Sequence, residues 1–301
     1  MIKITICSHK GGVGKTTTAL NLAAGLALAE HYAASRRKPA RVLLVDMDPQ
    51  GNSSLIASKG LFSDSDNQED TSVGKNLAHL LIEEDPPPTI DLIRTARIPT
   101  MIQQSNLDYL RVHIPDMAQA SRMLGTIEAS DQRLADGLTQ VEQHYRYCVI
   151  DTGTEYGSML LNALTASDYT ILPIELTGLG LASITDTLGT IRKVQKRLNR
   201  NLQVLGILPS KCNFQRSEAR SIYEALKTEY SDLLFEPIKE RAEVSVAITE
   251  GLDMFSYRPP RRHSDNYLSG SPSVQEFARF VADVMKRIEK NHRSVPAGTL
   301  S

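Results

Sequence analysis

Residues 2–17 read Ile-Lys-Ile-Thr-Ile-Cys-Ser-His-Lys-Gly-Gly-Val-Gly-Lys-Thr-Thr and decide the fold of this chain. A short apolar strand pattern runs into a glycine-rich loop, and a helical pattern follows from about residue 16 to residue 34. Glycines lack a Cβ atom, so the N–H groups of such a loop can turn inward around phosphate oxygens. The pattern predicts a phosphate-binding loop in which Lys15 neutralises the β- and γ-phosphates and the Thr16 hydroxyl holds Mg²⁺.

The loop differs from the common pattern Gly-x4-Gly-Lys-[Ser/Thr], because His9 replaces the first glycine and a second lysine, Lys10, follows it. It resembles the deviant Walker A loop of the ParA/MinD group of P-loop ATPases, and the chain is similar to the ParA family within that group. In this family the first lysine crosses a dimer interface and touches the partner's phosphates, so the resemblance implies that role for Lys10. It also implies that ATP is bound by Lys10, Gly11, Gly12, Val13, Gly14, Lys15, Thr16 and Thr17.

The composition is that of a soluble globular protein, with 301 residues, 41% hydrophobic and 23% charged. No apolar run approaches the roughly 18 to 20 residues of a membrane span, and no signal peptide is visible. Cys7, Cys148 and Cys212 are dispersed in or beside strand-like segments. We therefore expect buried thiols in a reducing cytoplasm.

Strand patterns alternate with helical ones, which predicts an α/β fold with a doubly wound, mainly parallel sheet flanked by helices. Ligands of such sheets bind beyond the carboxyl ends of the strands. We expect a single domain over 1–293, with a loop-rich insertion at 58–90, a basic loop at 257–272 and a tail at 294–301. The expected strands are 2–7, 41–46, 147–151, 169–174 and 202–208.

A second motif, Asp46-Met47-Asp48-Pro49-Gln50-Gly51-Asn52, follows the second expected strand. Acids at the end of a buried strand, facing a phosphate loop, are suited to positioning Mg²⁺-bound and attacking waters. The segment resembles the D-x-D-P-Q-G-N box of the ParA family. That resemblance implies that Asp48 orients the attacking water and that Asp46 supports the metal shell.

A third motif, Tyr147-Cys148-Val149-Ile150-Asp151-Thr152, is similar to a Walker B strand, which implies that Asp151 contacts Mg²⁺ through water. The family usually continues D-x-P-P or D-x-A-P, whereas this chain has Gly153-Thr154-Glu155. Without the prolines we expect a less rigid loop, and Glu155 adds an acid near the site.

The segment 209–213 follows the last expected strand, at the place where the family's loop contacts the base. By that resemblance Asn213 reads an adenine edge. Asn213 also replaces the acid of the guanine-reading pattern Asn/Thr-Lys-x-Asp, which favours ATP over GTP. A plain loop asparagine is the alternative interpretation.

Acidic residues predominate over 1–180 and basic residues over 181–301, a distribution compatible with binding a polyanion such as DNA. Several contacts between cations and phosphates give salt-sensitive, sequence-independent binding. The basic cluster at 192–200 is open to two interpretations, DNA contact or a solvated helix face. The resemblance and the basic loop predict DNA contacts at Arg216, Arg241, Arg258, Arg261 and Arg262.

The resemblance implies a partition ATPase, which forms a sandwich homodimer on ATP, binds non-specific DNA at the nucleoid and releases it when a ParB-like partner stimulates hydrolysis. One alternative is a MinD-like membrane-associated positioning ATPase, because the expected helix 273–292 has an apolar stripe with Lys286, Arg287 and Lys290 opposite it. Core packing on the sheet is the interpretation that we favour for that stripe, and we expect no membrane partner. A second alternative is a metabolic or metal-related branch of the superfamily, which requires clustered cysteines.

Overall fold

The computed structural model describes all residues except 36, 60–73, 100–101, 103, 259–270 and 295–301. Its centre is a seven-stranded sheet in the order β3-β4-β2-β5-β1-β6-β7, in which only the edge pair β3–β4 is antiparallel. The strands are β1 Ile2–Ile6, β2 Arg41–Met47, β3 Ile93–Thr95, β4 Leu107–Leu110, β5 Tyr145–Thr152, β6 Tyr169–Ile174 and β7 Gln203–Pro209. The predicted doubly wound, mainly parallel α/β fold is confirmed.

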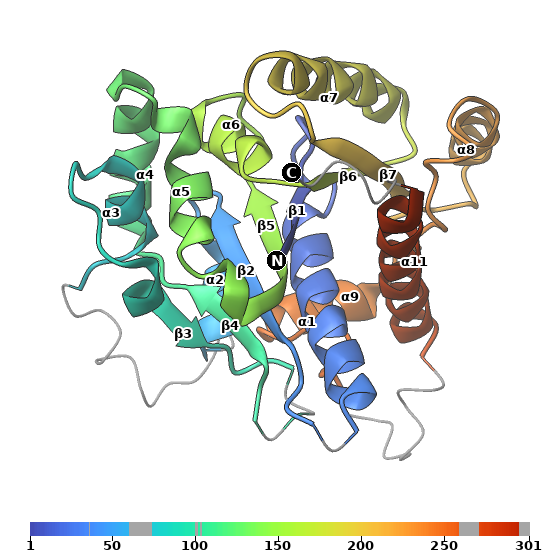
Figure 1. Ribbon diagram of the computed structural model, residues 1–301. Helices are drawn as coiled ribbons and strands as arrows, with labels where there is room; N and C mark the ends of the chain where they lie inside the picture. The colour runs from blue at the N-terminus through green and yellow to red at the C-terminus, as the bar shows by residue number, and fades with distance from the viewer. Residues whose placement is uncertain (36, 60–73, 100–101, 103, 259–270, 295–301) are drawn as a thin grey trace.

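Helices cover both faces of this sheet (Figure 1). The α-helices are α1 Lys15–Ala33, α2 Asn52–Lys59, α3 Leu77–Ile82, α4 Ile114–Met123, α5 Arg133–Thr139, α6 Ser158–Thr165, α7 Gly178–Arg197, α8 Ser217–Glu229, α9 Ala242–Thr249 and α11 Pro272–Ser294. Short 3-10 turns are η1 Thr89–Leu92, η2 Leu124–Thr126, η3 Ser130–Gln132 and η4 Glu142–His144.

The alternation of side chains along the central strands divides the core into two layers. Ile4 and Ile6 of β1 pack into a cluster formed with α1, α2, α9 and α11. Cys7 points to the other face, where α6, α7 and α8 pack, and Cys148 packs there with α3 to α6. Central strands of a parallel sheet are buried on both faces, which explains their continuous apolar runs.

The long C-terminal helix α11 packs against α1 on one face of the sheet. Its apolar stripe is buried in the core, with Phe277, Val284 and Ile288 each no more than 2% exposed. Core packing thus accounts for the apolar stripe. Within the described part of the chain, no helix combines the length and apolar character needed to span a bilayer.

Two features differ from the sequence-based expectations. The strands β3 and β4 were not predicted, because they have only three and four residues and give too short a pattern. The expected loop-rich insertion at 58–90 contains α3, whose N-cap Asn76 accepts a hydrogen bond from Ala78 N at 3.0 Å.

Most of the expected basic loop, 259–270, lies outside the described residues. The three cysteines are free and buried, as predicted.

Candidate active site

The glycine-rich loop lies at the carboxyl end of β1 and leads directly into α1. Gly12 and Gly14 have φ angles of 79° and 85°, in the left-handed region that favours glycine. Gly14 precedes the first helical residue, Lys15, and its carbonyl accepts a hydrogen bond from Thr18 N at 2.8 Å. The free N–H groups and the positive dipole end of α1 therefore point to the same place, which suits an anion.

Lys15 is buried in the mouth of this loop, with 7% of the residue exposed. Its Nζ donates to the carbonyl oxygen of Lys10 at 3.3 Å. Burial lowers the pKa of the Lys15 ammonium, and the carboxylates of Asp151 and Asp48 act in the opposite direction. A cation held among carboxylates in this position is available to a phosphate that enters the loop.

Two predicted acids lie side by side because their strands are neighbours. Asp46 of β2 and Asp151 of β5 are register partners, and both are fully buried. Asp46 is anchored, since Oδ1 accepts from Asp48 N at 3.1 Å and Oδ2 from Ser54 N at 3.0 Å. Burial raises the pKa of Asp46 to about 6 despite these hydrogen bonds.

Asp151 is not anchored in the way that Asp46 is, because neither of its carboxylate oxygens has a hydrogen-bond partner among the described residues. Burial first, and then the charge of Asp46, raise the pKa of Asp151 well above its ordinary value, although the nearby Thr16 hydroxyl acts in the opposite direction. A buried carboxyl group without partners is costly unless another group satisfies it. This orphaned carboxylate, with Thr16 in the first turn of α1, fits a hard divalent cation.

Asp48 lies beyond the end of β2, half-buried, and its Oδ1 accepts from Gln50 N at 3.0 Å. The segment that replaces the family prolines lies beside it: a Cβ on Gly153 would be 3.4 Å from Asp48 Oδ1. A cavity of about 410 Å³ opens here, lined by Asp48 and Gln50 on one side and Glu155 on the other. Asp48 is therefore accessible to water beside the phosphate loop.

A second cavity, of about 340 Å³, adjoins the loop at Gly14 and Thr17. The opposite wall comes from the segment after β7 and from residues 238–249. Ser210 Oγ donates to Val13 O at 2.5 Å and Lys211 Nζ donates to Gly12 O at 2.6 Å, so the wall is joined to the loop. Its position and volume suit a nucleoside whose phosphates occupy the loop.

Comparisons with known proteins agree with this geometry. Residues 1–204 match the family model described as "AAA domain". The chain is 32% identical to the sporulation initiation inhibitor protein Soj of Bacillus subtilis, over 90% of this chain and 97% of Soj. It is also 32% identical to the chromosome partitioning protein ParA of Myxococcus xanthus, over 88% of this chain and 85% of that protein. The chain belongs to the ParA family of P-loop ATPases.

The fold is also found in a solved structure. The structure of an ATP complex of Cyanothece McdA superposes with a TM-score of 0.72 at 19% identity, covering 95% of this chain and 96% of McdA. At this level of identity the superposition concerns the fold alone. The two chains therefore share their fold over nearly their whole lengths.

Lys10, which corresponds to the first lysine of the ParA-family loop, forms its side-chain contacts within this chain. Lys10 Nζ donates to Glu175 Oε2 at 2.7 Å and to Thr177 Oγ1 at 3.2 Å. These acceptors lie between β6 and the start of α7, more than 160 residues away in sequence. The sequence around Lys10 contains no signal of its contact with Glu175, so the sequence analysis did not predict Glu175 as a site residue.

Asn213 lies close to this site, but the structure does not bring it into the cavity beside the loop. Its Oδ1 accepts from Gln215 N at 3.1 Å, and it lines a neighbouring hollow with Phe214 and Arg220. From the segment 209–213, the residues that line the nucleoside-sized cavity are Ser210 and Lys211. Their place directly after a strand end is the signal by which the sequence points to them.

The arginines predicted to contact DNA are dispersed over the ParA-family fold. Arg241 forms an ion pair with buried Glu276, with Nη1 to Oε2 at 2.6 Å and Nη2 to Oε1 at 2.9 Å, and it lines the nucleoside-sized cavity. Arg216 is exposed at the start of α8. Arg258 donates to the carbonyl oxygens of two neighbours in the chain. Arg261 and Arg262 lie outside the described residues.

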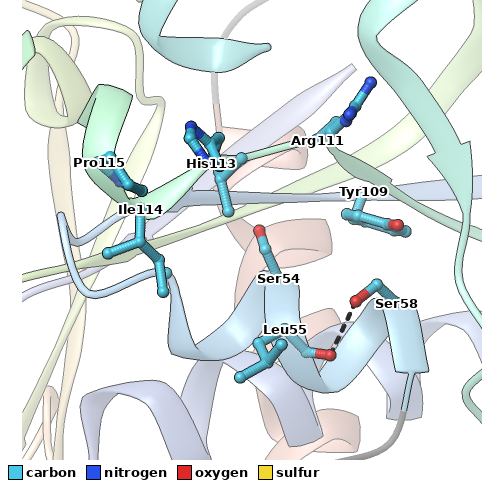
Figure 2. A pocket seen from close by; sticks show the side chains of 10 residues that line it. Ser54, Leu55, Ser58, Tyr109, Arg111, His113, Ile114 and Pro115 are labelled. Carbon is cyan, nitrogen blue, oxygen red and sulfur yellow. Dashed lines mark hydrogen bonds between the residues drawn. The ribbon is translucent and has the colours of Figure 1, made fainter. Parts of the chain in front are cut away.

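One further cavity, of about 240 Å³, lies behind the Asp46–Asn52 turn (Figure 2). Ser54, Leu55 and Ser58 of α2 face the segment after β4 across it. Gly51, with φ 63°, closes one end, because a Cβ there would be 3.2 Å from Val112 Cγ2. This cavity contains none of the predicted phosphate, metal or catalytic side chains.

Proposed function

We propose that this chain is a partition ATPase in which ATP closes a homodimer that binds DNA without reading its sequence. Hydrolysis, accelerated by a ParB-like partner, releases the DNA and so positions a plasmid, a chromosome or another cargo. The protein acts in the cytoplasm and associates with the nucleoid in its ATP-bound state. The observation that carries the proposal is the convergence of Lys15, Asp48 and Asp151 at the carboxyl ends of three neighbouring strands.

Magnesium fits this convergence. Mg²⁺ in nucleotide enzymes uses one or two carboxylates together with phosphate oxygens and water, rather than a complete protein cage. Among the described residues, no group of three or more His, Cys, Asp or Glu is placed to hold a metal by itself. Thr16 and Asp151 would hold the ion, with Asp46 beside them, and the ion would neutralise charge on the transferred phosphate.

The proposed roles of the remaining side chains follow from where each lies. Lys15 binds the β- and γ-phosphates from within the loop. Asp48, at an opening accessible to water, orients the attacking water. Lys10 is half-buried at the rim of the loop, and on dimerisation it serves the partner's nucleotide. Since only the γ-phosphate state favours this closed dimer, ATP acts as a switch between two states.

DNA binding is supported by a cationic stripe on α7 and the turn that follows it. All of its members are exposed, and none forms an ion pair within 4.0 Å in the described part of the chain. Cations without ion-pair partners, at helical spacing, suit a phosphate backbone, because each contact releases counterions. The stripe consists of Arg192, Lys193, Lys196, Arg197 and Arg200.

A DNA mobility-shift assay with ATP, ADP and no nucleotide tests the proposal. We expect binding only with ATP, and a steep loss of affinity as salt is raised. Replacing Lys196 and Arg197 together by glutamate should weaken binding about tenfold or more and reduce the salt slope by about two.

The matched control is Lys227→Glu on α8, where the lysine is already paired with Glu224 at 2.9 Å. This variant should bind nearly as tightly as the wild type. Tight binding without nucleotide, or a salt-independent affinity, would refute the proposed switch.

A further inference from the structure

The ammonium group of Lys10 donates hydrogen bonds to two side chains of its own chain. Glu175 Oε2 lies 2.7 Å from Lys10 Nζ, and the two side chains are only 28% and 23% exposed. Thr177 Oγ1 accepts a second hydrogen bond from the same nitrogen. A charge-assisted pair that is largely shielded from water is stronger than an exposed one. Lys10 is thus fixed in one position relative to its own loop.

Glu175 itself lies on a rigid part of the fold. A Cβ on Gly180 would lie 2.0 Å from the backbone oxygen of Glu175, so only glycine permits this close approach. Thr177 Oγ1 also accepts from Gly180 N at 3.1 Å, which caps the first turn of α7. The carboxylate is therefore held by the junction of β6 and α7 and not by a freely moving loop.

The backbone of Lys10 is tied to the nucleotide site as well. Its carbonyl accepts from Lys15 Nζ at 3.3 Å, the ammonium that would bind the subunit's own phosphates. ATP in the loop would draw Lys15 towards the phosphates and compete with this hydrogen bond. The position of the Lys10 side chain then depends on its hydrogen bonds to Glu175 and Thr177.

We propose that Glu175 is a positioning residue that retains Lys10 in its own subunit until the phosphates of a partner subunit replace the carboxylate. The inference rests on the proposed function, since it requires Lys10 to act across the dimer. A nucleoside triphosphate carries more negative charge than one carboxylate, so the exchange is favourable only against a loaded partner. Glu175 thereby opposes dimerisation of subunits that lack ATP.

Sedimentation equilibrium with Mg²⁺ and a non-hydrolysable ATP analogue tests this role. Glu175→Gln removes the competing charge and keeps the shape of the side chain, so its dimer should dissociate at a roughly three- to tenfold lower concentration than that of the wild type. Glu175→Ala should shift dimerisation in the same direction. The matched control is Glu218→Gln, because Glu218 accepts from Gly178 N at 3.1 Å at the same helix end. That control should not strengthen the dimer.

The decisive comparison is made in a Lys10→Ala background, which we expect to remain monomeric, and there Glu175→Gln should not restore dimerisation. A general change of charge or of packing would act there as well, which would overturn the positioning role. Unchanged or weaker dimerisation of Glu175→Gln, with a dimeric wild type, would overturn this inference alone. A wild type that stays monomeric with the analogue would overturn both this inference and the proposed function.

Discussion

At the scale of single residues, the site brings two buried carboxyl groups close together. Asp46 and Asp151 are fully buried register partners, and burial raises the pKa of each. Asp46 at least receives two backbone hydrogen bonds, whereas Asp151 has no hydrogen-bond partner among the described residues. These buried carboxyl groups lower the stability of the fold, and a cation bound between them would raise it.

This charge predicts a pH dependence of stability. A raised pKa means that the folded state binds more protons than the unfolded state between about pH 4 and the raised pKa, so stability falls as pH rises across this range and stays low above it. Asp151→Asn has no ionisable group at this position, so this loss of stability with rising pH should not occur in the variant. Its free energy of unfolding without nucleotide should exceed that of the wild type at pH 8 by about 1 to 3 kcal/mol, and the difference should vanish towards pH 4.

Urea denaturation at several pH values measures this difference. Asp136→Asn is the matched control, because Asp136 is exposed and should change stability by less than about 0.5 kcal/mol. A variant of Asp151 that is less stable than the wild type at pH 8 would contradict the charge argument.

The role of Asp48 predicts a separation of binding from hydrolysis. Asp48→Ala should bind ATP and dimerise, while steady-state hydrolysis falls by about 100-fold or more. The control is Glu155→Ala, since Glu155 lines the same cavity but is exposed. If hydrolysis instead persists in Asp48→Ala and is lost in Glu155→Ala, the catalytic role belongs to the extra acid.

At the scale of elements, the contact between α1 and α11 depends on a glycine. A Cβ on Gly25 would lie 2.5 Å from Val281 Cγ2 and 3.0 Å from Phe255 Cε2. Glycine within a helix costs about 1 kcal/mol relative to alanine. Here the close approach of the two helices offsets that cost, whereas a Cβ on Gly189 of α7 would meet no heavy atom within 4 Å.

These two glycines predict substitutions of opposite sign. Gly25→Ala should lower the free energy of unfolding by about 1 kcal/mol or more, because Val281 or Phe255 must move. Gly189→Ala should raise it by about 0.5 to 1 kcal/mol through helix propensity alone. Chemical denaturation of both variants measures the effects, and equal changes of the same sign would refute the packing argument.

The elements that the sequence predicted well are those with long or local signals. The strand-like patterns identified β1, β2, β5, β6 and β7, and the glycine loop predicted the start of α1. The short strands β3 and β4 were missed because β4 pairs with β2, more than 60 residues away in sequence, and β3 pairs only with β4 in the described sheet. Their stability comes from tertiary contacts, which a local pattern does not record.

At the scale of the whole molecule, the same distinction separates the parts of the site. The phosphate loop and the acids at 46, 48 and 151 were predictable, because each motif ends a strand and parallel strands end at one edge. The partners of Lys10 and Arg241 were not. Glu175 and Glu276 reach them only through folding, across separations of 165 and 35 residues.

The central claim is that Lys10 acts on the nucleotide of a second subunit. Light scattering with Mg²⁺ and a non-hydrolysable ATP analogue tests it most directly, on the wild type, Lys10→Ala and Lys15→Ala. The wild type should double in mass, Lys10→Ala should bind the analogue but remain a monomer, and Lys15→Ala should bind at least about 100-fold more weakly. A Lys10→Ala protein that dimerises as readily as the wild type would contradict the account.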